Sequence, residues 1–355
     1  MQVRITQKME CSKAQKLKIK LVSLAAAVSL ISILIASLNY PVLGVYKEML
    51  RGAFGSLYSL KYVVIKTIPL VICAIGVSFA YQMKFWNIGA EGQLMMGAFA
   101  ATGIALFYNH FPKPAVLLMM AASAMLMGAV WILIPAVFKI AYGINETILT
   151  LMLNYIAAQW IAYLQYSRWK DTKAFGFPKI ATFDDKAVLP EFFGIHAGFY
   201  IMLAILVIAY VLFRFTKLGY KMRIIGQSSE TAKYLGIKKN RIMFIMVALS
   251  GAACGLCGMV QVAGVEHSLN TSVSNNVGFS AILIAWLSNL SPVVILPVAF
   301  LFAGLSEGAG YLQTVFQIPQ DIAVIIQGIL LFCVTGSEFF TKFSIEFKRD
   351  GKEVA

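Results

Sequence analysis

Residues 85–93 read FWNIGAEGQ, and the apolar run LMMGAFAATGIALF follows them directly. Three polar residues, Asn87, Glu91 and Gln93, therefore stand within seven positions at the start of a segment long enough to cross a membrane. An ionisable side chain near the centre of a bilayer costs about 2.5 to 3.5 kcal/mol on insertion scales. These residues are therefore candidates for a structural or functional role.

Apolar runs of similar length recur along the whole chain of 355 residues, of which 59% are hydrophobic and 13% are charged. In soluble domains about a quarter of all residues are charged, so this charged fraction is low for a soluble protein. The composition therefore predicts an all-α, polytopic integral membrane protein with about 8–10 transmembrane helices. The ten candidate segments are 21–43, 60–81, 89–108, 114–138, 147–166, 198–213, 242–265, 278–290, 292–305 and 322–340. The eighth and ninth are short, so residues 278–305 could form two full spans, a broken helix or a re-entrant pair.

The net charge of +14 comes largely from a few hydrophilic segments. Lys and Arg dominate residues 1–20 and 214–241, whereas acidic residues balance them in the long loop 168–197. The positive-inside rule then places the basic tail 1–20 and the loop 214–241 in the cytoplasm and the loop 168–197 outside. Ten crossings agree with this arrangement and put the tail 341–355 inside, so both termini of the membrane domain 21–340 are predicted to be cytoplasmic. This distribution indicates membrane lipid, not nucleic acid, as the partner of the positive charge.

The first apolar run follows a basic tail, which is also the pattern of a secretory signal peptide. Residues 21–43 exceed the usual apolar core of such a peptide, which is about 7 to 15 residues long. We therefore expect this run to be a retained first span.

Glu146, Thr150 and Asn154 step by four residues, so they share one face of a predicted helix, and Tyr155 lies beside them. Thr150, Asn154 and Tyr155 would suit the pathway of a polyhydroxylated solute, because they offer hydrogen-bonding groups without a fixed charge. Alternatively, the stripe holds two helices together, with Asn145 as the N-cap and Glu146 at the positive end of the helix dipole.

Small residues predict close helix packing in two places. Gln93 shares a helix face with Gly97, so its amide should lie in a tightly packed surface, while Gly251 and Gly255 form a close-approach motif. For Glu91 two interpretations remain open, namely a structural hydrogen bond to a neighbouring backbone and a role in gating or subunit contact.

The basic loop 214–241 contains a short helix signal. Ser228 or Ser229 could cap the helix, and Gly236 follows its last turn as a stop. Such a helix could lie on the membrane surface or dock into a groove of another protein.

The motifs that an enzyme would need are absent from the sequence. It contains no G-x-x-x-x-G-K-[ST] motif, so a P-loop of its own cannot bind ATP. The histidines stand alone, and Cys254 and Cys257 form a single CxxC within an apolar run, which disfavours zinc or redox chemistry. We therefore expect no catalytic residues, no metal and no cofactor in this chain.

Four motifs occur together in this chain and resemble those of one family. They are NIGAEGQ (87–93), ETILTLMLNYIA (146–157), the spaced set Gly219, Arg223, Gly226, Ala232, Gly236 and Ile237, and ALSGAACGLCG (248–258). From about Pro69 to Phe340 the chain resembles permease subunits of ABC importers of the ribose and simple-sugar class. More closely, it is similar to the larger permease of nucleoside importers that work with a basic-membrane-protein-type lipoprotein. It departs from the family pattern at residues 82–86, where the glycine-rich lead-in is replaced.

The resemblance implies a permease of the bacterial plasma (inner) membrane that pairs with a second, homologous permease. An external substrate-binding lipoprotein would deliver the solute, and a separate cytoplasmic ABC ATPase would bind and hydrolyse ATP. Within the loop 214–241, Arg223, Gly226, Ala232 and Gly236 would belong to the segment that couples to the ATPase. Asn87, Glu91, Gln93 and Glu146 would then serve gating or helix packing.

Two other functions remain open from the residues alone. A secondary transporter coupled to ions or protons would use Glu91 and Glu146 as coupling carboxylates, and a channel would need neither residue. Whether the solute is a nucleoside or a sugar, and whether the two permeases are identical, cannot be read from this sequence.

Overall fold

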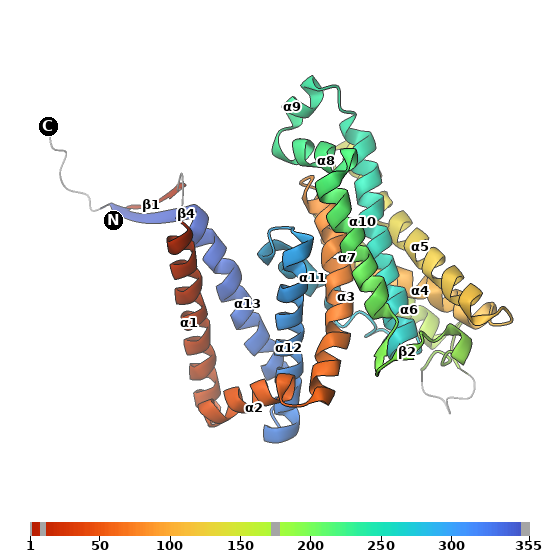
Figure 1. The fold of residues 1–355 in the computed structure, drawn as a ribbon, viewed down its shortest axis with the longest axis horizontal. Helices are drawn as coiled ribbons and strands as arrows, with labels where there is room; N and C mark the ends of the chain where they lie inside the picture. Colours follow the sequence, from red (N-terminus) through yellow and green to blue (C-terminus); the bar gives the residue numbers. More distant parts are fainter. Residues whose placement is uncertain (1, 8–11, 172–177, 349–355) are drawn as a thin grey trace. The chain divides into compact units, whose positions relative to one another are not determined.

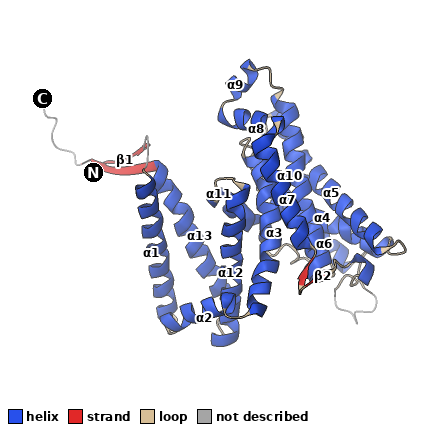
Figure 2. Cartoon of the chain, viewed as in Figure 1, coloured by secondary structure: helices blue, strands red, loops and turns tan. Residues whose placement is uncertain are grey.

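The computed structural model describes residues 2–7, 12–171 and 178–348, and helices make up most of them (Figure 2). Its contacts divide the chain into two units, residues 1–60 with 304–355 and residues 61–303. All ten predicted apolar segments form helices, as expected for an all-α membrane protein. Within the described residues, seven helices are long and apolar enough to cross a membrane, or eight if one bent pair counts as a single span.

The first unit contains α1 (Lys13–Ser37), α2 (Val42–Phe54), α13 (Gln320–Lys342) and the second half of α12 (Pro292–Phe316). The segment 21–43, predicted as a first span, is not one straight helix, because α1 ends at Ser37 and α1 and α2 are bent by 113° relative to each other. Asn39 adopts a positive φ of 62° and Pro41 precedes α2, so the helix cannot continue through this turn. Buried Ile31 and Ile35 of α1, Val45 of α2 and Leu312 of α12 belong to one apolar core.

Two strands in this unit were not anticipated. β1 (Gln2–Gln7) pairs antiparallel with β4 (Phe343–Lys348), so the segments predicted as tails, 1–20 and 341–355, meet in a two-stranded sheet. Helix α1 also begins within the basic segment, eight residues before the first predicted span.

The second unit is built around α10 (Lys239–Gln261), which packs against α4 (Ala90–Phe107) and α5 (Lys113–Tyr142). A Cβ at Gly255 would collide with the carbonyl of Ala124 and with Gly128, and one at Gly251 would collide with Gly128. The close-approach motif therefore packs against α5 of the same chain, as its spacing predicted for a neighbouring helix. On another face, the thiol of Cys257 donates to the carbonyl of Pro69 in α3 (Leu57–Tyr81) at 3.3 Å.

The remaining long helices of this unit are α6 (Glu146–Tyr166) and α7 (Gly198–Phe215). Two short helices, α8 (Lys217–Gln227) and α9 (Ser229–Tyr234), lie at one end of the helices, and β2 (Glu191–Phe192) lies at the other (Figure 1). The two long hydrophilic loops of the sequence are therefore on opposite ends of this unit, as the charge distribution predicted.

The loop 168–197 docks onto the end of α10. It contains the 3-10 helix η1 (Asp185–Ala187) and a hairpin of β2 with β3 (Ile195–His196). The Phe183 N–H donates to the carbonyl of His267 at 2.8 Å, next to the π-helix η2 (Val262–Glu266). His196 is buried against Gly264 of this π-helix, and burial lowers its pKa to about 4.

Residues 278–305, which the sequence left undecided, form a short helix followed by a full-length one. Helix α11 (Val277–Leu287) has 11 residues, whereas α12 has 25 and continues past residue 305 to Phe316. At 1.5 Å per residue α11 covers about 16 Å, half of a membrane crossing.

Candidate functional site

Two stretches of non-helical backbone lie inside the second unit. One is the connection 82–89 between α3 and α4, and the other is the stretch 267–276 between η2 and α11, which we call the break segment. The helices that follow them are joined where the carboxylate of Glu91, in the first turn of α4, accepts the N–H of Gly278, in the first turn of α11, at 2.7 Å. Non-helical backbone at membrane depth is tolerated only where protein or water satisfies it. The residues that satisfy it therefore define a candidate site.

The polar stripe of α6 satisfies the backbone of the α3–α4 connection. Glu146 accepts the N–H of Trp86 at 3.1 Å, and the Thr150 hydroxyl accepts that of Ile88 at 3.2 Å. Asn154 accepts the N–H of Gly92 at 2.8 Å and donates to the carbonyl of Ile88 at 3.0 Å. Since Glu146 and Asn154 are eight residues apart, the connection follows α6 for about 12 Å into the membrane.

The cap of α6 has the predicted form. The Asn145 side chain accepts the N–H of Thr147 at 2.9 Å. Glu146 also forms an ion pair with Lys139 at the end of α5, and the Lys139 ammonium lies 5.1 Å from the ring centroid of Phe85. The same carboxylate thus holds the α5–α6 hairpin to the α3–α4 connection.

Gln93 is buried, as its position on a packed face predicted, but its amide bonds within its own segment. It donates to the side chain of Asn87 at 2.9 Å and accepts from it at 3.2 Å. Asn87 in turn donates to the hydroxyl of Ser250 on α10 at 3.3 Å. Asn87 and Gln93 together therefore fasten the start of α4 to α10.

Glu91 is 4% exposed and caps the half-helix α11. Besides Gly278, the Ser274 hydroxyl and the backbone N–H groups of Asn276 and Phe279 interact with its carboxylate. These donors are the ones that a helix N-terminus leaves without partners inside the helix, and the helix dipole favours a negative charge there. Of the two interpretations of Glu91, the geometry shows the backbone hydrogen bond.

The far end of α11 is held by the same connection. The Gln82 amide donates to the carbonyl of Leu290 at 3.3 Å, and Trp86 stacks on Trp286 with ring centroids 5.4 Å apart. Gln82 and Trp86 lie in the part of the chain that departs from the family pattern. Both ends of α11 are therefore anchored to residues 82–91.

The break segment was not identified from the sequence, where these residues lie between the predicted segments 242–265 and 278–290. His267, its first residue, accepts a hydrogen bond from the loop 168–197. Asn276, its last residue, is two positions before Gly278, which binds Glu91. The signal was present as the polar run HSLNTSVSNN directly before an apolar run too short to cross a membrane. His267, Asn275 and Asn276 adopt positive φ values of 52°, 45° and 60°, which prevents a continuous helix.

The loop 214–241 forms a compact pair of helices. The predicted short helix is confirmed, because the Ser228 hydroxyl accepts the N–H of Thr231 at 3.2 Å and Gly236 follows with a φ of 67°. Arg223 donates to the carbonyl of Phe213 at 3.2 Å, and Ala232 is fully buried. A Cβ at Gly226 would collide with the carbonyl of Gln82. All four residues assigned to coupling therefore shape the loop or attach it to this chain.

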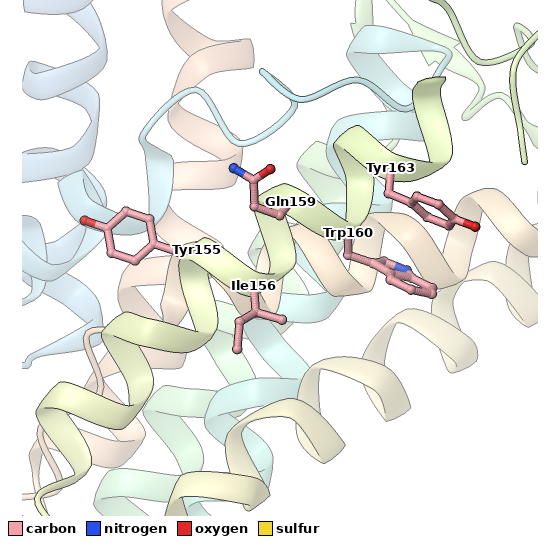
Figure 3. Close-up of a pocket in the computed structure, with 5 residues that line it drawn as sticks. All are labelled: Tyr155, Ile156, Gln159, Trp160 and Tyr163. Carbon is pink, nitrogen blue, oxygen red and sulfur yellow. The ribbon is translucent and has the colours of Figure 1, made fainter. Parts of the chain in front are cut away.

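Tyr155 lies on the opposite side of α6 from the buried stripe. It is 63% exposed and lines a shallow pocket of about 400 Å³ with Ile156, Gln159, Trp160 and Tyr163 (Figure 3). Thr150 and Asn154 are buried, so Tyr155 is the residue of the predicted pathway set whose side chain is accessible. Among the described residues no group of three or more His, Cys, Asp or Glu side chains could hold a metal ion.

Comparison with known proteins shows several similar permeases. The glucose ABC transporter permease of Haloferax volcanii is 29% identical over 92% of this chain and 90% of its own. The nucleoside ABC transporter permease of Lactococcus lactis is 25% identical over 94% and 93%. The guanosine ABC transporter permease of Bacillus subtilis is 26% identical over 84% and 87%. Residues 59–335 match the family described as "Branched-chain amino acid transport system / permease component", and the chain therefore belongs to this permease family.

Proposed function

We propose that this chain is the transmembrane permease subunit of an ATP-driven ABC importer that moves nucleosides or simple sugars across the bacterial plasma (inner) membrane. The family is one of permeases, and the relatives of Lactococcus lactis and Bacillus subtilis are named for nucleoside and guanosine transport. The relative of Haloferax volcanii is named for glucose. In this proposal ATP is bound and hydrolysed by a separate cytoplasmic subunit, since the chain has no P-loop.

The observation that carries the proposal is the construction of the loop 214–241. Its inner face is fixed to the chain by Gly219, Met222 and Ile225, which are buried, while Tyr234 at the end of α9 is 92% exposed. A large aromatic side chain on a rigid, basic, polar loop is typical of a residue that binds in a pocket of a partner protein. Movement of an ATPase could thus reach the membrane helices through Gly226, which touches the backbone of Gln82.

The other proposed partners are a second, homologous permease and an external substrate-binding lipoprotein. In this proposal the non-helical stretches 82–89 and 267–276 keep their positions while the two permeases alternate access. The residues proposed to hold them are Asn87, Glu91, Gln93 and Glu146. Thr150, Asn154 and Tyr155 remain the proposed pathway residues, with Tyr155 the accessible one.

The geometry favours an importer over a proton-coupled transporter. Glu146 is paired with Lys139 and bonded to the Trp86 N–H, and Glu91 caps α11. Both carboxylates are therefore engaged in holding backbone segments, whereas a coupling carboxylate must exchange protons with water during transport.

Replacing Tyr234 tests the docking surface. We expect Tyr234→Ala to lower the amount of ATPase that co-purifies with the solubilised permease about tenfold or more, the scale of an interface hot spot. Tyr166→Ala is the matched control, because Tyr166 is also an exposed tyrosine, at 66%, and it ends α6 directly before the loop 168–197, which lies at the other end of the unit (Figure 1). Equal recovery of ATPase with both variants would contradict the proposed docking surface.

A further inference from the structure

We propose that Gln82 and Trp86 are positioning residues for ATP-driven transport, because they link the loop 214–241 to the C-terminal end of α11. With Trp286 and Leu290 they form a latch that holds α11 in the position seen here and opens when the loop moves. The proposal rests on the proposed function and goes beyond it, because it names the helix that the ATPase moves and the residues that transmit the movement.

The link between the loop and α11 passes through a single residue, Gln82. Its carbonyl oxygen lies against Gly226 of α8, where an added Cβ would collide with it. Its side-chain amide donates to the carbonyl of Leu290, just beyond the end of α11, at 3.3 Å. Since both contacts belong to one residue, a displacement of α8 acts directly on the end of α11.

Three aromatic rings close the latch beside this hydrogen bond. Trp86 stacks on Trp286 with ring centroids 5.4 Å apart and planes within 5° of each other. Tyr81, the last residue of α3, meets both rings edge-on, with centroids at 5.3 Å and 6.1 Å. Such pairs stabilise an arrangement beyond the area that they bury. Because Trp86 is 40% exposed, the rings can separate without leaving a cavity in the core.

The sides of α11 are lightly packed, so the helix can move as one piece. Four of its residues are buried, and three of these are small, namely Gly278, Ala281 and Ala285. Elements with few buried apolar contacts open and shift at low cost in free energy. At the other end of α11, Gly278 is bonded to Glu91. Opening of the latch would therefore let α11 pivot about that bond.

The C-terminal end of α11 is locally strained in the latched position. Ser288 is 1% exposed, and its hydroxyl has no hydrogen-bond partner among the described residues, which is unfavourable for a buried polar group. Asn289 and Leu290 have positive φ values of 49° and 57°, and this conformation is uncommon for a leucine. Strain of this kind gathers in switch regions. Relief of the strain lowers the cost of opening the latch.

Hydrogen exchange in the complete importer tests the opening. In the latched position the N–H groups of Asn289 and Leu290 donate to the carbonyls of Trp286 and Ala285, at 2.9 Å each. We expect these two amides to exchange at least tenfold faster when ATP and vanadate trap the ATPase than without nucleotide. The amide of Tyr108, which follows α4 at the other end of the unit, is the control and should be unchanged. Equal exchange of Asn289 and Leu290 in both states would overturn the latch.

Coupling can be measured in proteoliposomes as the ATP hydrolysed per molecule of solute imported, with guanosine and glucose each tested as the solute. Trp86→Ala should raise this ratio about 3- to 10-fold, because hydrolysis continues while α11 no longer follows the loop. Gln82→Ala should raise it in the same range, and Trp86→Phe, which keeps a ring, should restore most of the coupling. Trp169→Ala is the matched control, because Trp169 stacks on Phe99 with centroids 5.1 Å apart and lies in the loop 168–197.

The ratio separates a positioning role from a structural one. A merely structural role would lower uptake and hydrolysis together and leave the ratio of Trp86→Ala equal to that of Trp169→Ala, which would overturn the proposal. If the unmodified complex shows no ATP-dependent uptake of either guanosine or glucose, the proposed function itself fails.

Discussion

The carboxylate of Glu91 is the clearest point at which to perturb the broken span. Glu91→Ala removes the acceptor of the Gly278 N–H and the negative charge at the N-terminus of α11. A hydrogen bond to a charged group contributes about 1.5–3 kcal/mol, and the helix dipole adds about 0.3–1 kcal/mol. The loss should therefore be about 2–4 kcal/mol. Glu91→Gln keeps an acceptor without the charge and should cost about half as much.

Hydrogen exchange measured by mass spectrometry can localise this effect. Opening of α11 should become easier by the same free energy, so amides of residues 278–287 should exchange about 30-fold faster or more in Glu91→Ala. Amides of α5 should be unchanged, which separates local loosening from general unfolding. Unaltered exchange in α11, or an equal increase in α5 and α11, would refute the role of Glu91 as the cap of this half-helix.

Three further outcomes follow from other contacts. Glu146→Ala should destabilise the protein by about 1–3 kcal/mol, because Lys139 is left half-buried without its partner, and the double variant Lys139→Met/Glu146→Gln should lose less in the same thermal denaturation assay. Because burial holds the pKa of His196 at about 4, below its ordinary 6.5, the unfolded chain takes up this proton first. Stability should be full above about pH 6.5 and fall by up to about 3 kcal/mol as the pH drops towards 4, and His196→Gln should flatten that fall. Gly255→Val should prevent folding, since its side chain would meet the carbonyl of Ala124, and recovery of normal amounts of purified protein would contradict this.

Periodicity and composition predicted most of the membrane helices, because each crossing needs a long apolar run. The spacing of Gly251 and Gly255 predicted close helix packing. Asn145 and the pair Ser228 and Ser229 were the candidates for two helix caps. These features are local in sequence, so a single chain is enough to recognise them.

The broken backbone could not be predicted in the same way. The Glu91 carboxylate caps α11 through Gly278, which lies 187 positions later in the chain. Likewise, the stripe of Glu146, Thr150 and Asn154 was predicted on one helix face, but its partner is extended backbone about 60 residues earlier. A polar side chain signals that it needs a partner at membrane depth, but only the fold shows which backbone supplies it.

The bend after α1 was missed for a related reason. The apolar run over residues 21–43 is long enough for one span, and hydropathy does not report the direction of the chain. Asn39 and Pro41 were the residues that indicated a turn. The strands β1 and β4 have no sequence pattern that distinguishes them from basic tails.

The most direct test of the proposed importer is guanosine uptake by proteoliposomes that contain this chain, its partner permease and ATPase, with the binding lipoprotein outside. The account predicts uptake that requires ATP and every one of these components, and that does not respond to a proton gradient. Uptake by the purified chain alone, driven by a proton gradient without ATP, would contradict it.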